Sequence, residues 1–255
     1  MFHKININEE IKNNKDFNYI TKLKSFKSGK MTEINFKPGL NIIFSENGSG
    51  KSTILNSLSE SMAAKQGGYS CVTETWHYGI KEKMKGVKVS HDGQPVVYFN
   101  PRDTIGLILG AFDDDFMIEG IGLLQMKEST GFTTMNKMIK ILNMFNDKQD
   151  MLKQIEYKMS EKYVNKEVKE MLKGDQEREQ LTFLMDEPES GLAIHVQNNL
   201  FKMINKAAKE KNIQIIMATH SLFALSCKEA NFIDLNEGYI DLVKREIMNL
   251  AVSVI

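Results

Sequence analysis

The stretch LNIIFSENGSGKST, residues 40–53, decides the fold of this chain. Its first part, Leu40–Phe44, is a short apolar run of the kind that forms a buried parallel strand. Small residues follow, with glycines at 48 and 50, and they allow backbone N–H groups to turn inward around phosphate oxygens. A helix expected over Ser52–Ala64 adds the positive end of its dipole at the same point. Strand, loop and helix together predict a phosphate-binding loop.

Each residue of this loop has an expected role at a nucleotide. Lys51 would reach the β- and γ-phosphates, and Ser52 would ligate Mg²⁺. One position departs from the usual pattern, because Ser45 stands where the first glycine is expected. Serine fits there only if the backbone is not forced to a positive φ. The residues expected to contact the nucleotide are Asn47, Gly48, Ser49, Gly50, Lys51, Ser52 and Thr53.

Two further motifs follow predicted buried strands. Leu181–Met185 (LTFLM) leads into Asp186-Glu187-Pro188, and acidic residues at such a place are unfavourable unless a cation or partner is present. Beside a phosphate loop, Asp186 would hold Mg²⁺ through water, and Glu187 would be the base that orients the attacking water. Ile213–Ala218 leads into Thr219-His220-Ser221, where His220 is a candidate sensor of the γ-phosphate.

Together these motifs resemble the ABC ATPase superfamily. ENGSGKST is similar to its Walker A motif and FLMDEPES to its Walker B motif with a catalytic glutamate, while Ser190–Leu192 and His220 stand at its D-loop and switch histidine. The motifs of this chain resemble those of chromosome-maintenance, DNA-repair and overcoming-lysogenization-defect (OLD) ATPases more than those of transporter subunits. EPESGL followed by Gln197 resembles AAA-type ATPases of phage defence. The resemblance implies an α/β P-loop NTPase fold of ABC type, with a RecA-like core and an N-terminal antiparallel β part.

The resemblance also implies head-to-head dimers, in which each ATP is closed by the partner's signature motif. No LSGGQ is present, and the best candidate is Ser129-Thr130-Gly131 at the start of a predicted helix, Phe132–Phe145. Ser129 and Gly131 would then contact the partner's nucleotide, although an ordinary capped helix remains the alternative. Residues 104–180 are the expected helical insertion in a single domain of residues 1–255. Asn100, where the family has glutamine, is either a shorter carboxamide or a turn residue.

The composition of the chain limits the kinds of partner that it can bind. Lys and Arg number 33, as do Asp and Glu, so the formal net charge is zero and a basic surface over the whole molecule is excluded, although a local basic patch is not. There is no apolar run long enough for a membrane span and no signal-peptide pattern, and the two cysteines have no metal or redox spacing. We therefore expect a cytoplasmic protein that uses ATP and Mg²⁺ and has no membrane partner.

The expected function is hydrolysis of ATP to ADP and phosphate by a head that dimerises around ATP and drives or gates a partner, for example in DNA repair or phage defence. The resemblance implies that this partner is a separate nuclease-like or toxin-like effector, or DNA. One alternative is a nucleotide-gated interaction module with little turnover, and another is the ATPase subunit of a transporter. A small-molecule kinase is disfavoured, because Glu187 and His220 suit attack by water.

The remaining segments carry weaker patterns. Residues 1–18 are polar and predict a loose lead-in, and Tyr19–Lys24 alternates like a strand. Asp92-Gly93 predicts a hairpin turn, and the strands Phe232–Leu235 and Tyr239–Val243 predict a second hairpin near the C-terminus. Tyr19 and Phe26 are candidates either for stacking on adenine or for core packing.

Overall fold

A parallel sheet forms the centre of the computed structural model, which describes residues 1–61, 69–70, 84–92, 94, 96–100 and 181–253. In these residues the central sheet has six strands in the order β4-β6-β7-β8-β3-β9, and only β4 runs antiparallel to its neighbour. This sheet confirms the predicted α/β P-loop fold. The expected insertion at 104–180 lies outside the described residues. The strands are β3 (Leu40–Phe44), β4 (Tyr69–Ser70), β6 (Val96–Phe99), β7 (Leu181–Asp186), β8 (Ile213–Thr219) and β9 (Asn231–Ile233).

A smaller antiparallel sheet is formed by β2 (Glu33–Asn35), β1 (Phe2–Ile7) and β5 (Val87–His91), in that order. It confirms the N-terminal antiparallel part. The expectation of a loose lead-in over residues 1–18 is wrong, because β1 is the middle strand of this sheet and buries Phe2, Ile5 and Ile7. The expected hairpin at Asp92 is also wrong. The half-exposed β5 pairs with β1, whereas the fully buried β6 joins the central sheet.

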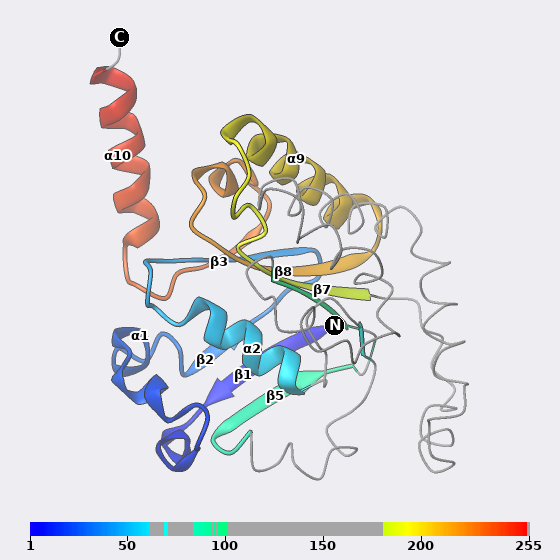
Figure 1. The fold of residues 1–255 in the computed structure, drawn as a ribbon, viewed down its shortest axis with the longest axis vertical. Coiled ribbons are helices and arrows are strands. Elements are labelled where there is room, and N and C mark those ends of the chain that lie inside the picture. The colour runs from blue at the N-terminus through cyan, green and yellow to red at the C-terminus, as the bar shows by residue number, and fades with distance from the viewer. Residues whose placement is uncertain (62–68, 71–83, 93, 95, 101–180, 254–255) are drawn as a thin grey trace, which may run out of the picture.

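Each face of the central sheet has its own core. Helix α2 (Lys51–Ser61) lies on one face and α9 (Ile194–Glu210) on the other (Figure 1). Side chains of β8 alternate between these cores, since Ile215 and Met217 pack with α9 while Ile216 and Ala218 pack on the α2 side. Such burial on both faces explains why the parallel strands are continuous apolar runs.

Short helical turns replace one other expected strand. Tyr19–Lys24 is not a strand but falls in the 3₁₀ turn Asn18–Lys22 and the start of α1 (Lys24–Lys27). Two more 3₁₀ turns cover Glu9–Asn13 and Leu222–Ser226.

The C-terminal strand of the expected hairpin is instead a helix, α10 (Tyr239–Ser253), which projects from the body (Figure 1). Tyr239, Ile240 and Val243 pack against the α9-side core. Residues at positions i, i+1 and i+4 share one side of a helix but fall on both faces of a strand, so this packing requires the helix. In the described residues, no helix combines the length and apolar character needed to cross a membrane.

One buried side chain connects the two sheets. Gln214 of β8 is 1% exposed, and its Nε2 donates to the carbonyl oxygens of Phe2 (2.8 Å) and Lys37 (3.0 Å). Its Oε1 accepts from the Phe2 N–H (2.7 Å) and the Thr182 hydroxyl (3.3 Å). A carboxamide can form all four bonds at once because it carries both donors and an acceptor with two lone pairs. Gln214 therefore fixes β1 against the central sheet.

We expect Gln214→Leu to lower the free energy of unfolding by about 3 kcal/mol, because it leaves buried backbone groups of Phe2 without partners. Thr182→Val removes only one of the four bonds and should lower it by about 1 kcal/mol. Urea denaturation of both variants measures this difference. Equal losses would show that Gln214 does not hold the two sheets together.

Candidate functional site

The ends of four neighbouring strands form one edge of the central sheet. Pairing aligns Phe99 of β6 with Met185 of β7, Asp186 with Ala218 of β8, and Phe44 of β3 with Thr219 of β8. Because parallel strands in register end together, the residues that follow them meet at this edge. The phosphate loop, the acidic pair, the segment with His220 and Asn100 are thereby brought to one place.

The loop after β3 has the backbone expected of a phosphate-binding loop. Gly48 and Gly50 have φ of 73° and 100°, values that side chains strongly disfavour. A Cβ on Gly50 would also lie 2.9 Å from Leu23 Cδ1, whereas one on Gly48 would meet nothing within 4 Å. Serine fits at position 45 because its φ is not positive; among the described non-glycine residues only Glu187 and Asn212 have positive φ.

Lys51 is held inside this loop. Its Nζ donates to the carbonyl oxygens of Ser45 and Glu46, both at 2.8 Å, and the residue is 5% exposed. Burial lowers the pKa of Lys51, and the nearby carboxylates of Glu187 and Asp186 act against that shift. The ammonium group is therefore a buried cation that faces the acidic pair.

Ser52 and Asp186 meet although they are far apart in the sequence. The exposed Ser52 is the second residue of α2, and its hydroxyl donates to Asp186 Oδ1 at 3.1 Å. Asn100 Nδ2 lies 3.5 Å from the other carboxylate oxygen, Oδ2. Hydroxyl and carboxylate oxygens are the ligands that Mg²⁺ prefers, so this pair fits a magnesium ion bound together with a nucleotide. Asn100 is thus at the site and not merely in a turn.

Glu187 and His220 form a second pair beside the first. Their Oε1 and Nδ1 atoms lie 3.3 Å apart, with the histidine side chain 44% exposed and the glutamate 10%. Glu187 has φ of 45°, and its N–H donates to the carbonyl oxygen of Ala218 at 2.8 Å. A non-glycine residue in this conformation is uncommon and marks a place where the surroundings fix the backbone.

Glu189 is an acidic residue at this site to which no sequence motif assigned a role. It is 4% exposed, and its Oε1 accepts a hydrogen bond from the Thr219 hydroxyl. Within the described residues its Oε2 is buried without a hydrogen-bond partner. Burial is the largest cause that raises the pKa of Glu189. The sequence has glutamates two positions apart, at Glu187 and Glu189, but no local pattern predicts that both side chains are buried.

Other contacts to the loop come from distant segments that carry no motif. Ser25 donates to the carbonyl oxygen of Ser49 at 2.6 Å, and Ser45 donates to Asn236 Oδ1 at 2.9 Å. Tyr19 is 40% exposed, and its hydroxyl lies 2.8 Å from that of Thr53. Phe26, by contrast, is buried in the α2-side core and packs there.

The remaining expected residues differ in what the structure describes. Asn47 and Gly48 lie exposed at the tip of the loop, whereas Ser49 is buried. Ser129 and Gly131, expected to contact the partner's nucleotide, lie outside the described residues.

We expect Glu189→Gln to change how the free energy of unfolding depends on pH. Because the pKa of Glu189 is raised in the folded state, its contribution is present at acidic pH and is lost as the pH rises through that folded-state pKa. Glutamine does not titrate. The free energy of unfolding of the variant, minus that of wild type, should therefore increase from about pH 5 to about pH 8. Urea denaturation at both pH values measures this. Glu237→Gln, which removes an exposed carboxylate, controls for the lost charge, and an unchanged difference between Glu189→Gln and wild type would contradict the prediction.

Comparison with known proteins places the chain in a family. A comparison with curated proteins gave no match. The model of a family described as an AAA domain matches residues 19–246, a span that contains the phosphate loop, the acidic pair and the His220 segment. The chain therefore belongs to the AAA domain family, P-loop ATPases of the chromosome-maintenance and DNA-repair kind, and this membership supports nucleotide binding and hydrolysis in general.

Proposed function

We propose that the chain is an ATPase that hydrolyses Mg·ATP to ADP and phosphate at the edge formed by β6, β7, β8 and β3. The observation that carries this proposal is the contact between Ser52 and Asp186 beside the pair of Glu187 and His220. These four residues come from three motifs that only the fold brings together. Phosphate binding, metal binding and activation of water thus have residues within one site.

The phosphate loop supplies the binding groups. The N–H groups at the start of α2 and the positive end of its dipole suit the phosphate oxygens. Lys51 donates to two backbone carbonyl oxygens, which are weaker acceptors than charged phosphate oxygens. We infer that the ammonium group exchanges these partners for the β- and γ-phosphates when ATP binds.

Ser52 and Asp186 would hold Mg²⁺, with the Asp186 carboxylate acting through water. The bound ion would offset the negative charge of the phosphates. Asn100 contacts the Asp186 oxygen that Ser52 does not, so it can orient the carboxylate. Asn100 would then take the place of the family's glutamine, with a carboxamide on a shorter side chain.

Glu187 would be the general base. It accepts a proton from a water molecule whose oxygen attacks the γ-phosphorus, and the bond from that phosphorus to the bridging oxygen of ADP breaks. His220 would donate a hydrogen bond to the γ-phosphate, and its 3.3 Å contact with Glu187 supports a shared place beside the attacking water. Because the backbone of Glu187 is fixed at both its N–H and its φ, the carboxylate is held ready for this step.

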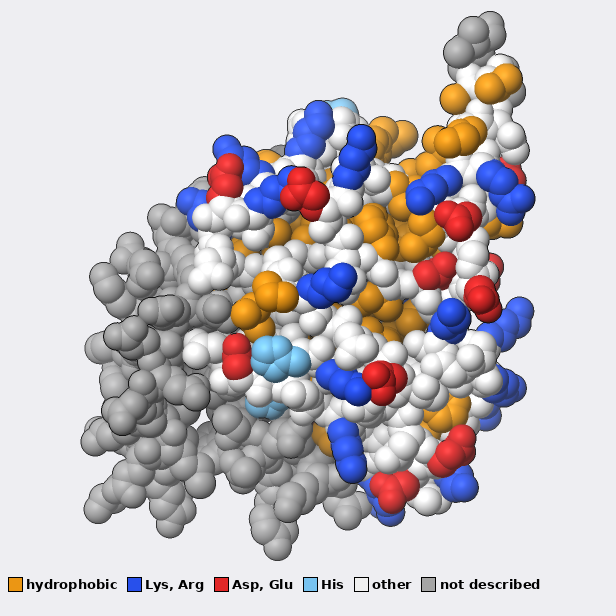
Figure 2. All heavy atoms as spheres, turned by 180° about the vertical axis from the view of Figure 1, so that it is seen from behind, with side chains coloured by type: hydrophobic (Ala, Val, Ile, Leu, Met, Phe, Trp, Pro, Cys, Tyr) orange, Lys and Arg blue, Asp and Glu red, His pale blue; other side chains and the backbone are white. Residues whose placement is uncertain are grey.

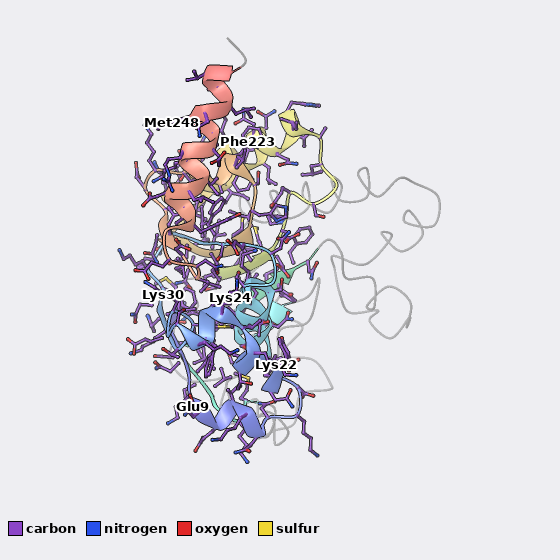
Figure 3. All side chains as sticks on the ribbon, turned by 90° about the vertical axis from the view of Figure 1, so that its left-hand side faces the viewer. Glu9, Lys22, Lys24, Lys30, Phe223 and Met248 are labelled. Carbon is purple, nitrogen blue, oxygen red and sulfur yellow. The ribbon has the colours of Figure 1, made fainter. Side chains whose placement is uncertain are left out.

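The proposed ATPase would act on a partner. We infer an ATP-dependent homodimer in which Ser129 and Gly131 close the partner's site. Exposed lysines on the N-terminal segment support DNA as a partner. Between residues 12 and 30 only one acidic residue, Asp16, offsets their positive charge. Figure 3 labels three of these lysines on one side of the molecule. The exposed lysines of this segment are Lys12, Lys15, Lys22, Lys24, Lys27 and Lys30.

A nucleotide-gated interaction module, with a separate effector protein such as a nuclease, is the second candidate. Its support is α10, where Leu242, Met248, Leu250 and Val252 are exposed. Apolar side chains also gather at the base of this helix (Figure 2). Exposed apolar groups on a projecting helix suit contact with another protein. Both candidates use the same nucleotide site and differ in the turnover expected.

We expect Glu187→Gln to bind Mg·ATP as wild type does but to hydrolyse it at least about 100-fold more slowly, because glutamine cannot take a proton from water. Steady-state phosphate release and equilibrium binding of a fluorescent ATP analogue measure the two effects separately. Lys51→Ala is the matched control, which should lose ATP affinity instead. Wild-type turnover in Glu187→Gln would remove Glu187 from the proposed chemistry, and negligible turnover in wild type would favour the interaction module.

We also expect Glu187→Gln to form a dimer with Mg·ATP, because ATP that bridges two chains stabilises the dimer that binds it. Light scattering with ATP and with ADP measures the mass of the complex. Ser129→Arg in the same background should abolish the ATP-dependent dimer and leave ATP binding to one chain intact. A dimer that persists in this double variant would exclude residues 129–131 as the signature.

A further inference from the structure

Gln197 connects two segments of the site that are far apart in the sequence. It lies in the first turn of α9, and its Nε2 donates to the carbonyl oxygen of Leu192 at 2.9 Å. Its Oε1 accepts from the Ser221 hydroxyl at 3.0 Å. The side chain does not cap its own helix, whose N-cap residue Ala193 has no side-chain cap bond. It instead bridges the turn after Glu187 and the loop that carries His220.

A second connection joins the same two segments. The Thr219 hydroxyl accepts from the Ser221 N–H at 2.9 Å and donates to Glu189 Oε1. Thr219, Ser221 and Glu189 are all at least nine-tenths buried, so water competes little for these bonds. His220 is therefore flanked by two residues that are both anchored to the segment 189–197.

The turn itself is ordered by short-range bonds. Ser190 N–H donates to the Glu187 carbonyl oxygen at 2.9 Å, and Leu192 N–H donates to that of Glu189 at 3.0 Å. Gln197 then holds the Leu192 carbonyl oxygen. A displacement of the turn would thus reach the Ser221 hydroxyl through the side chain of Gln197, in addition to the path through Glu189 and Thr219.

We propose that Gln197 is a positioning residue that keeps the loop of His220 in register with the turn that follows Glu187. The inference rests on the proposed function, in which Glu187 and His220 act on the same phosphate. Within the described residues the side chain of Gln197 forms its hydrogen bonds with Leu192 and Ser221, and it acts through these two residues. A carboxamide is required, because one end must donate and the other must accept. Small displacements of reacting groups reduce rates strongly, so loss of this bridge should lower turnover without weakening ATP binding.

Hydrogen exchange tests the bridge directly. In nucleotide-free protein, Ser221→Ala removes the hydroxyl at one end, and we expect the Leu192 amide at the other end to exchange roughly fivefold faster. Gln197→Ala should accelerate exchange of the amides of both Leu192 and Ala224, whose N–H donates to the Ser221 carbonyl oxygen. Asn199→Ala, an exposed change on the same helix, is the matched control and should alter neither. Acceleration confined to the mutated segment in Ser221→Ala would overturn the proposal.

Kinetics separate positioning from general stability. We expect Gln197→Ala and Ser221→Ala each to lower kcat about tenfold with little change in ATP affinity, and the double variant to lose little more than either one. Ser221→Thr, which keeps the hydroxyl, should retain most of the rate. If the two losses in kcat multiply in the double variant, the residues do not share a bridge. A loss of ATP affinity with kcat unchanged would also contradict the proposal. If wild type does not hydrolyse ATP, the proposed function fails, and the exchange experiment still decides whether Gln197 couples the segments.

Discussion

The register of the parallel strands β6, β7, β8 and β3 is the constraint on which the site depends. Their pairing places Asn100, Asp186, Thr219 and the start of the phosphate loop at one edge of the sheet. A shift of one residue in any strand would invert its side chains and move its final residue along the edge. The two cores oppose such a shift, because each strand has apolar side chains buried on both faces. Packing on the faces therefore fixes the chemistry at the edge.

Buried charge is the second constraint. Lys51 is almost completely buried, and isolated buried charges are strongly unfavourable. Two loop carbonyl oxygens and the facing carboxylates compensate for this burial. Glu189 has less compensation, since burial raises its pKa and one of its oxygens has no hydrogen bond in the described residues. This tension between buried groups is common where a protein binds charged ligands, and it agrees with a site made for phosphate and a cation.

The sequence predicted the parts of the fold where a local pattern and the final structure agree. β3, β7 and β8 match their expected ranges to within one residue, because each is an apolar run that ends in a motif. β1 was missed because lysine and asparagine separate its buried residues, and α10 because its mostly apolar start, Tyr239–Val243, is also compatible with a strand. The contacts of Asn236, Ser25 and Gln197 could not be predicted, since they join segments without a motif. Register and packing determine these contacts, and neither is visible in a local pattern.

The central claim is that Ser52 and Asp186 hold a divalent cation together with a nucleotide. Mn²⁺ in place of Mg²⁺ makes this claim measurable, because electron paramagnetic resonance distinguishes bound from free Mn²⁺. The account predicts that wild type binds Mn²⁺ tightly only when a non-hydrolysable ATP analogue is present. In Asp186→Asn the signal of bound Mn²⁺ should weaken strongly while the analogue still binds. Equal Mn²⁺ binding in Asp186→Asn and wild type, or binding that does not depend on the nucleotide, would contradict the account.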